Sequence, residues 1–446
     1  MKRIVLLAAF AFLVLAALST SASAQGLSYT VGIQIKNLDS VAAENAQIVY
    51  YNMDGSVAGT LDLPTIPANG SVTYAQVEGV GDGFSGSAVI NSANQLAAIV
   101  NVCANGICGM GASYTAFDSG DTTAGLPLIM RNNSGYSTLF NVQNVGSGAA
   151  NVTVTYSNGT TETAVIQPNA AHRFDQATNT NLGNVFVGSA TVTSDVPVVA
   201  TVLEQGATTL FGYDGFRSGD ASTNPVMPLV NANNSGYITG IQIQNRGTAS
   251  TTVTVNYTPS SAGTACQETQ TIAGNGASAT FALNAFSGTY SGENCANGAA
   301  FVGSATVTAN SSGQPLVAIV NQLNIAANKG AAYGGFNPAN GSSIVELPLI
   351  MDRNSGFWTG FAITNVGTQN TNITCTYVGS AHVDSQNNVQ PGGSFTVINL
   401  NVLGAGYVGA ATCTASGGDA KIVGIVNELK TDATGDTFLV YEGTNR

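Results

Sequence analysis

The sequence predicts an all-β protein made of four antiparallel β-sandwich units in tandem. The first observation behind this prediction is a long motif that recurs along the chain. It is clearest from Leu126 to Gly146, where Leu-Pro-Leu-Ile-Met is followed by Asn-Asn-Ser-Gly-Tyr and by Leu-Phe-Asn-Val-Gln-Asn-Val-Gly. It returns at 227–247 and 347–367, and a truncated copy starts at Gly32 without a preceding Leu-Pro-Leu. The other two observations are short alternating apolar segments and the turn residues between them.

The chain begins with a segment typical of an export signal. Lys2 and Arg3 precede an apolar run from Ile4 to Leu18, and Ala22-Ser23-Ala24 is a small-residue cleavage site. The apolar run is shorter than the ~20 residues that a membrane-spanning helix needs. We therefore expect a signal peptide at 1–24 and a secreted or cell-surface protein that has no integral membrane span after cleavage.

Charge and composition exclude several classes of partner. The chain has 12 basic and 24 acidic residues, and loss of Lys2 and Arg3 changes the formal charge from −12 to −14, that is 10 minus 24. Such an acidic surface disfavours nucleic acid and anionic lipid. Charged residues are only 8% of the chain, so solubility must rest on Asn, Ser, Thr and Gly. Because apolar residues reach 44% and alternate regularly, we do not expect disorder.

Each unit begins with an alternating strand that ends in Asn and continues with a second alternating strand that ends in Tyr. Alternation of apolar and polar residues indicates a strand with one face buried and one face exposed. The successive Asn residues are 107, 101 and 120 positions apart. The Asn positions are Asn37, Asn144, Asn245 and Asn365, and the Tyr positions are Tyr50, Tyr156, Tyr257 and Tyr377.

The rest of each unit is predicted as a turn, another strand, a hairpin and a last strand. Pro and Gly in the turns supply the backbone angles that tight reversals need. The turns lie at 67–71, 168–171, 274–277 and 391–394. The hairpins begin at Phe84, Phe186, Phe301 and Tyr407, and the last strands carry the pairs Tyr114/Phe117, Tyr213/Phe216, Tyr333/Phe336 and Phe438/Tyr441.

About seven short strands in roughly 100 residues are the signature of an antiparallel sandwich. The predicted domains are 25–125, 126–226, 227–346 and 347–446. The order Ile-x-Asn-x-Gly, then a strand ending in Tyr, then Pro-x-Gly-Ser before an aromatic strand resembles tandem immunoglobulin-like domains of bacterial surface proteins. It is similar in particular to the cell-adhesion-related domains that secreted proteins carry in arrays. The resemblance spans all four units, implies an immunoglobulin-like fold and a surface role, and assigns no functional residue.

Six cysteines, all in the mature chain, indicate disulfides in an oxidising compartment. In the repeat register, Cys375 and Cys413 replace apolar core residues of the other units, so we expect them to be bridged across the sandwich, as in antibody domains. Cys266 and Cys295 lie in segments peculiar to the third unit, and Cys103 and Cys108 flank a hairpin tip. Each bridge should contribute ~2–4 kcal/mol. A metal or redox site is disfavoured because no His is near and Cys-x-x-Cys is absent.

The sequence offers no catalytic constellation, and we expect no enzyme activity and no cofactor. The two histidines, His172 and His382, occupy different repeat positions among polar residues, and no Gly-x-Ser-x-Gly elbow is present. Aspartates gather near two unit boundaries, where calcium could stiffen a joint, but turn-forming Asp explains them equally well. These residues are Asp118, Asp121, Asp214 and Asp220.

Two functions are compatible with these observations. The first is a non-enzymatic structural protein, a four-domain rod that assembles with itself or with cell-envelope components. The second is an adhesin or carbohydrate-binding protein, whose loop aromatics would form stacking platforms for glycans. Packing at strand edges is the alternative explanation for these aromatics. They are Tyr136, Tyr237, Phe357 and Trp358.

The first unit also lacks one strand. Units two to four open with Leu-Pro-Leu or Met-Pro-Leu, whereas the first has only 25–30 in that place. A sandwich without an edge strand exposes unpaired backbone groups and part of its core. Either residues 25–30 fill the gap, or the first unit accepts an extended segment from another molecule by strand addition.

Overall fold

The computed structural model describes residues 9–13, 27–105, 108–283, 285–286, 295–311, 313–430 and 434–446. The fold is all-β, with 61% of residues in strands and 2% in helices. Within the described residues, neighbouring strands pair antiparallel, and one isolated parallel bridge joins Met110 to Asp436. The predicted all-β class is thus confirmed.

Each repeat unit contributes an outer and an inner sheet, and the first unit shows the pattern. Its outer sheet has the order β1-β6-β3-β4 and its inner sheet the order β5-β2-β7-β8. The outer strands are β1 (Ala9–Leu13), β6 (Gly86–Ser92), β3 (Gln47–Asn52) and β4 (Val57–Asp62). The inner strands are β5 (Ser71–Tyr74), β2 (Tyr29–Asn37), β7 (Leu96–Ala104) and β8 (Met110–Thr115).

The third and fourth units repeat this order. The third has β16 (Val226–Ala232), β21 (Phe301–Ala309), β18 (Thr251–Ala262) and β19 (Cys266–Ile272) outside, and β20 (Ser278–Phe281), β17 (Ile238–Asn245), β22 (Leu316–Asn324) and β23 (Lys329–Gly334) inside. The fourth has β27 (Val383–Val389), β26 (Thr371–Tyr377), β29 (Tyr407–Ser416), β24 (Ile344–Asp352) and β32 (Thr444–Asn445) outside, and β28 (Ser394–Asn399), β25 (Trp358–Asn365), β30 (Ile422–Leu429) and β31 (Phe438–Glu442) inside.

The predicted hairpin is wrong, because its two arms belong to different sheets. In the first unit β6 lies in the outer sheet and β7 in the inner sheet, and they do not pair with each other. In the second unit the crossing is one 20-residue strand, β14 (Phe186–Gln205), which joins both sheets into one of seven strands. Its neighbours are β9 (Asp121–Arg131), β10 (Ser137–Asn144), β11 (Ala150–Tyr156) and β15 (Leu210–Asp214), and β12 (Thr161–Ile166) and β13 (Ala171–Asp175) form the edges.

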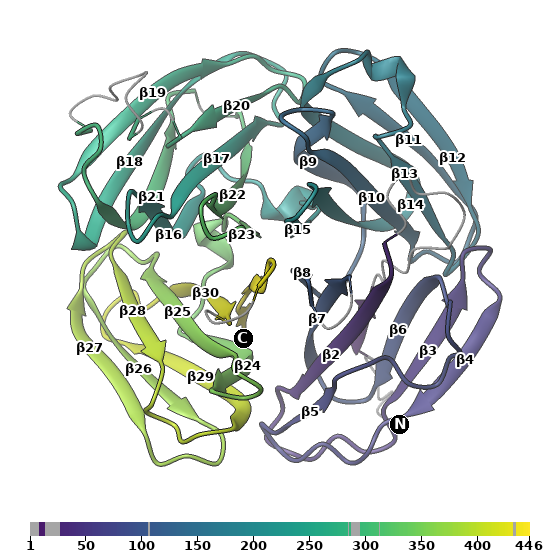
Figure 1. Cartoon of the computed structure of the whole chain (residues 1–446), viewed down its shortest axis with the longest axis horizontal. Coiled ribbons are helices and arrows are strands. Elements are labelled where there is room, and N and C mark those ends of the chain that lie inside the picture. The colour runs from purple at the N-terminus through teal and green to yellow at the C-terminus, as the bar shows by residue number, and fades with distance from the viewer. Residues whose placement is uncertain are drawn as a thin grey trace, which may run out of the picture.

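The four units close into a ring, with the first unit beside the last (Figure 1). The rod expected from the sequence is therefore not what forms. Each core takes apolar side chains from the next unit, which makes the joints hydrophobic. The donated residues are Leu139, Leu203 and Leu210 into the first unit, Val317, Ile319 and Ala332 into the second, Ala362, Ile425, Phe438 and Val440 into the third, and Ile99 into the fourth.

Three of the four joints share one hydrogen bond, and the closing joint uses an ion pair instead. A serine hydroxyl on an outer strand donates to a turn carbonyl of the next unit: Ser87 to Asn169 at 2.6 Å, Ser189 to Gly276, and Ser304 to Gly392 at 2.5 Å. The fourth unit has Ala410 at this position. There, buried Lys36 of the first unit meets buried Glu346 at 3.2 Å, and Arg446 lies 3.4 Å from the same carboxylate.

The bridge Cys375–Cys413, expected from the repeat register, is present, and the other four cysteines pair as Cys103–Cys108 and Cys266–Cys295. One detail needs correction. Cys375 on β26 and Cys413 on β29 are direct partners on neighbouring strands of one sheet, so this bridge does not cross the sandwich. Both cysteines are buried in the core, as the register predicted. They can form a bridge because side chains at paired positions of adjacent strands point to the same face of the sheet.

The empty strand position of the first unit is filled from a third source. β1 pairs with β6, from Ala9 opposite Ser92 to Leu13 opposite Ala88. The alternative that 25–30 fill the gap is wrong for the part of that segment that the structure describes, since Leu27 and Ser28 lead directly into β2 of the inner sheet.

Candidate functional site

The last inner strand of each unit lies at the centre of the ring, so that β8, β15, β23 and β31 are neighbours (Figure 1). Small residues permit this close approach. A Cβ added to Gly212 would lie 2.8 Å from the carbonyl oxygen of Ser113, and one added to Gly330 would lie 2.4 Å from the Phe211 ring. The geometry therefore requires glycine at these two places.

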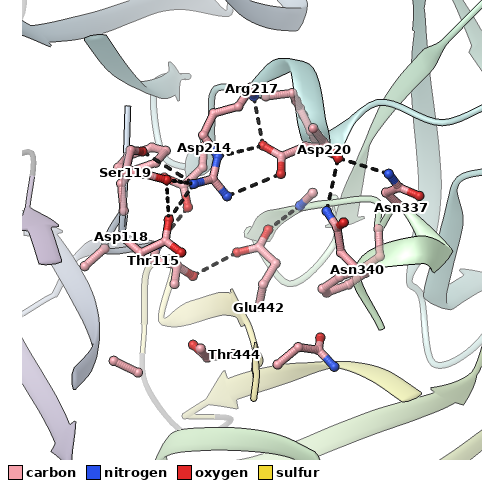
Figure 2. A pocket seen from close by; sticks show the side chains of 18 of the residues that line it. Thr115, Asp118, Ser119, Asp214, Arg217, Asp220, Asn337, Asn340, Glu442 and Thr444 are labelled. Atoms are coloured by element: carbon pink, nitrogen blue, oxygen red, sulfur yellow. Dashed lines mark hydrogen bonds and ion pairs between the residues drawn. The ribbon is translucent and has the colours of Figure 1, made fainter. Parts of the chain in front are cut away.

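A pocket of about 830 Å³ lies at the ends of these strands and is lined by all four units. Its floor is built at one repeat position, the residue that follows the fully buried tyrosine of each last strand. The residues at this position are Thr115, Asp214, Gly334 and Glu442. Figure 2 shows Thr115, Asp214 and Glu442 together with residues of the rim.

The two carboxyl groups on the floor accept hydrogen bonds from neighbouring units. Asp214 accepts the Thr115 amide at 2.9 Å, and Glu442 accepts the Thr115 hydroxyl at 3.1 Å and the Gly334 amide. The other Asp214 oxygen, Oδ1, has no partner in the described part of the chain. Burial raises the pKa of Asp214 far above its usual range, and the Glu442 charge adds to this; burial also raises the pKa of Glu442. A protonated floor carboxyl can donate a hydrogen bond to a ligand.

Arg217 organises the rim of the pocket (Figure 2). Its guanidinium lies 3.2 Å from Asp220, contacts Asp118 at 2.5 Å, and donates to the Ser119 hydroxyl at 2.7 Å. Although burial opposes it, the charges of Asp220 and Asp118 raise the pKa of Arg217. Asp121 accepts the Ser218 amide at 2.8 Å. An arginine thus lies among the aspartates that were considered for calcium, and within the described ranges no three His, Cys, Asp or Glu side chains form a metal-binding group.

The walls of the pocket combine amides with aromatic rings. The side-chain amides of Asn337 and Asn340 both donate to the Gly219 carbonyl, at 3.0 and 3.2 Å, and thereby fix the third unit against the second. Three phenylalanines stand at one repeat position around the wall, Phe117, Phe216 and Phe336. Carboxyl, amide and hydroxyl groups beside apolar rings suit a neutral polyhydroxylated ligand.

At the opposite end of the axial strands, one buried acid ties three units together. Asp436 accepts the backbone amides of Leu210 at 3.0 Å and Gly330 at 2.8 Å. Lys329 donates to the Thr437 hydroxyl at 2.6 Å. Burial raises the pKa of Asp436 to about 8, against the effect of these amides and of Lys329. This end of the axis is a structural clamp.

A second, smaller pocket of about 200 Å³ lies in the closing joint between the first and fourth units. Ile33, Ile99, Leu349 and Phe357 give it apolar walls. Beside them, Glu428 is 1% exposed and accepts the Asn101 side-chain amide at 2.9 Å, and burial raises its pKa to about 8.

The aromatics predicted as glycan platforms are all partly buried. Tyr136 and Tyr237 are half-buried and pack edge-on against Phe211 and Phe438, with ring centroids 5.7 and 5.5 Å apart. Phe357 lies under Lys430, whose Nζ is 5.9 Å from the ring centroid, and Trp358 is half-buried at the start of β25. The motif before them is a tight reversal in which Asn133 and Tyr136 exchange two backbone hydrogen bonds of 2.9 Å.

The histidines lie apart from the axial pocket. His172 is on strand β13, not in a loop, and packs edge-on against Phe174; burial lowers its pKa, opposed by Glu162. His382 lies 3.1 Å from Asp384.

The sequence analysis considered Asp214 and Asp118 only as possible calcium ligands and missed Glu442 and Arg217 altogether. The available signal was positional: four different residues each follow the tyrosine of a last strand.

In the described part of the chain, no helix is long and apolar enough to cross a membrane. Neither a known protein-family model nor a curated protein matches this chain. The Thermotoga maritima 1070 crystal structure is similar over 22% of this chain and 96% of its own, at 18% identity and a TM-score of 0.19. A likeness at that score carries no argument about fold or function.

Proposed function

We propose that this protein is an exported, non-enzymatic binding protein of the cell surface, whose ring builds one carbohydrate-binding pocket on its axis. The observation that carries the proposal is the convergence of four equivalent positions on the pocket floor, where Asp214 and Glu442 stand beside Thr115. The three disulfides support export, since such bonds persist in oxidising compartments.

A glycan is the ligand class that this pocket favours. Hydroxyl groups of a sugar can both donate and accept, which matches carboxyl oxygens and a protonated acid on the floor and amide oxygens on the wall. The edge of a sugar ring is apolar and can contact Phe336, which is half-buried in the wall. The about 830 Å³ of the pocket lies within the usual range for small-molecule sites. The four units are then domains at the boundaries predicted from sequence, immunoglobulin-like as the resemblance implies.

A structural, self-assembling surface protein is the second candidate. The strand position beside β6 supports it, because removal of residues 1–24 would leave this position open. A closed ring, however, presents no free end for assembly into a rod.

A glycan array probed with the chain 25–446, followed by titration calorimetry on the best glycan, tests the first proposal. Asp214→Ala and Asn337→Ala should each weaken binding at least tenfold, since each removes a polar group that lines the pocket. Asn387→Ala, an exposed change on β27, is the matched control and should bind as the unaltered chain does.

Two results would contradict the proposal. The first is an array without any bound glycan. The second is binding that survives both pocket variants but is lost when Tyr136, Tyr237 and Trp358 are replaced by Ser, which would place the site in the loops.

A further inference from the structure

The outer sheet of the first unit is completed by residues that the sequence predicts to be removed on export. β1 occupies the position beside β6 that β9, β16 and β24 occupy beside β14, β21 and β29 in the later units. Cleavage after Ala24 would release β1 and leave this position, which we call the open slot, without a strand.

The open slot lies at one edge of the outer sheet, beside β6. β6 is held against the second unit by the bond from Ser87 to Asn169. The corresponding first strands of later units contact the inner strands of the next unit, as β9 contacts β17 and β22, and β24 contacts β2 and β7. β1 itself lies mainly against β6 and β7 of its own unit. The open slot therefore has room for one extended segment beside β6.

A buried side chain at the joint beside the open slot lacks hydrogen-bond partners, which a bound segment could supply. Gln143 on β10 is 0% exposed, and neither its Nε2 nor its Oε1 has a hydrogen-bond partner among the described residues. In other units, the residue at the repeat position of Gln143 bonds to the neighbouring unit across the joint. Lys36 reaches Glu346 on β24, and Gln244 donates to the Ala190 carbonyl at 3.0 Å. A buried amide with both groups unsatisfied is unfavourable, so a hydrogen-bond partner there is favoured.

We propose that in the exported protein the open slot binds one extended, mainly apolar segment of a partner protein, which pairs antiparallel with β6 and bonds to Gln143. The Leu-Pro-Leu strands of the later units define the chemistry of that segment. A second mature copy could supply such a segment only by releasing one of these strands, whose leucine carbonyls accept hydrogen bonds of 2.6 Å from buried tyrosines. The pairs are Tyr213 to Leu128, Tyr333 to Leu229 and Tyr441 to Leu349. The proposal rests on the export and cleavage proposed above.

The test uses the full chain with a specific protease site inserted between Ala24 and Gln25, so that one molecule is measured with the slot filled and then emptied. This design does not depend on the shortened chain folding alone. The probe is a fluorescein-labelled peptide of residues 124–131, Ala-Gly-Leu-Pro-Leu-Ile-Met-Arg, followed by fluorescence anisotropy. A peptide in which both leucines are replaced by Asp is the control.

After cutting and removal of the N-terminal fragment, the protein should bind the peptide with a micromolar Kd and melt at a higher temperature with peptide than without it. The uncut protein should bind at least tenfold more weakly, and Gln143→Leu should weaken binding by the cut protein several-fold. Equal binding by cut and uncut protein, or none by either, would overturn the proposal. Concentration-dependent association of the cut protein without peptide would also overturn it, since the occupant would then be a second copy.

Failure of the export proposal is recognised separately. If the N-terminus of the protein recovered from culture lies before Ala9, then export with cleavage is wrong, while the cut protein still reports whether the open slot takes a strand.

Discussion

The opening strand of each unit ends in an asparagine that makes the same hydrogen bonds in all four units. Asn365 is fully buried, and its amide donates to the carbonyls of Gln369 and Val389, both at 2.8 Å. Its oxygen accepts the Gly367 amide at 2.9 Å. Equivalent bonds are made by Asn37, Asn144 and Asn245. The residue thus satisfies backbone groups of two loops that the sandwich buries.

Replacing Asn365 by Ala should lower the free energy of unfolding by about 2–4 kcal/mol, because two buried backbone groups and one partly buried group lose their partner. Chemical denaturation monitored by fluorescence would measure the change. The exposed Asn387→Ala change should shift stability by about 0.5 kcal/mol or less. Similar effects of the two changes would show that the Asn365 bonds do not stabilise the fold.

Residues were predictable from the sequence where the repeats keep one chemical role, and not where they change it. The Cys375–Cys413 pair could be predicted because both residues replace apolar core residues in the repeat register. The pocket floor could not, because Asp214 and Glu442 share their position with Thr115 and Gly334, and no common chemistry marks it. Convergence of these four residues depends on the ring, which no single unit encodes.

At the scale of elements, the closing joint differs from the other three. Among the described residues, Ile99 is the one buried apolar side chain that the first unit contributes to the core of the fourth, and a buried ion pair joins Lys36 to Glu346. Burial lowers the pKa of Lys36, while the Glu346 charge opposes that effect. Breaking such a pair from one side leaves a buried charge without compensation.

Glu346→Gln should therefore destabilise the protein by about 3–5 kcal/mol. The double change Lys36→Thr with Glu346→Val copies the equivalent residues of the joint between the third and fourth units, Thr364 and Val226. This variant should recover most of the loss, because no buried charge remains. Thermal unfolding of the unaltered protein, Glu346→Gln and the double variant would measure these differences in stability. If the double variant is no more stable than Glu346→Gln, the pair contributes more than the removal of its charges explains.

The strands themselves could be predicted, but the sheet to which each belongs could not. Alternation identified the outer strand β11, whose buried and exposed residues alternate along its length. The inner strands β7, β22 and β30 instead contain continuous buried runs, such as Ala97–Val100 and Leu316–Val320. Continuous apolar runs mark strands covered on both faces. Here the neighbouring unit covers the second face. These continuous runs could therefore have predicted from the sequence which strands form the joints between units.

At the scale of the whole molecule, burial of acids at the joints is the property with the widest consequence. Glu204 is fully buried, its Oε2 accepts the Asn321 amide at 2.7 Å across a joint, and its Oε1 has no partner in the described part of the chain. Glu428 has the same arrangement with Asn101. Burial raises the pKa of both to about 8, and that of Asp436 likewise. Folding therefore favours the protonated acids.

The ring should accordingly be most stable in mild acid. A carboxyl whose pKa rises from about 4 in the unfolded chain to about 8 in the fold binds more protons when folded, so its contribution is complete below about pH 4 and is lost as the pH rises to about 8. Asp352 acts in the opposite direction. Although burial opposes it, hydrogen bonds from Arg353 and the amides of 401–403 lower its pKa to about 2, so its contribution is lost as the pH falls from about 4 to about 2.

Together these shifts predict a maximum of the thermal midpoint near pH 4–5 and a decline towards pH 8. Glu204→Gln is the matched variant, because Gln322 stands at the same repeat position in the third unit and bonds to Asn427 at 3.3 Å. The variant should lose part of the decline between pH 5 and pH 8 while its midpoint at pH 5 changes little, since Gln resembles the protonated acid. Calorimetry across pH 3–9 would measure both proteins. A midpoint that rises from pH 5 to pH 8, or an equal slope in the variant, would show that these acids are ionised in the folded ring.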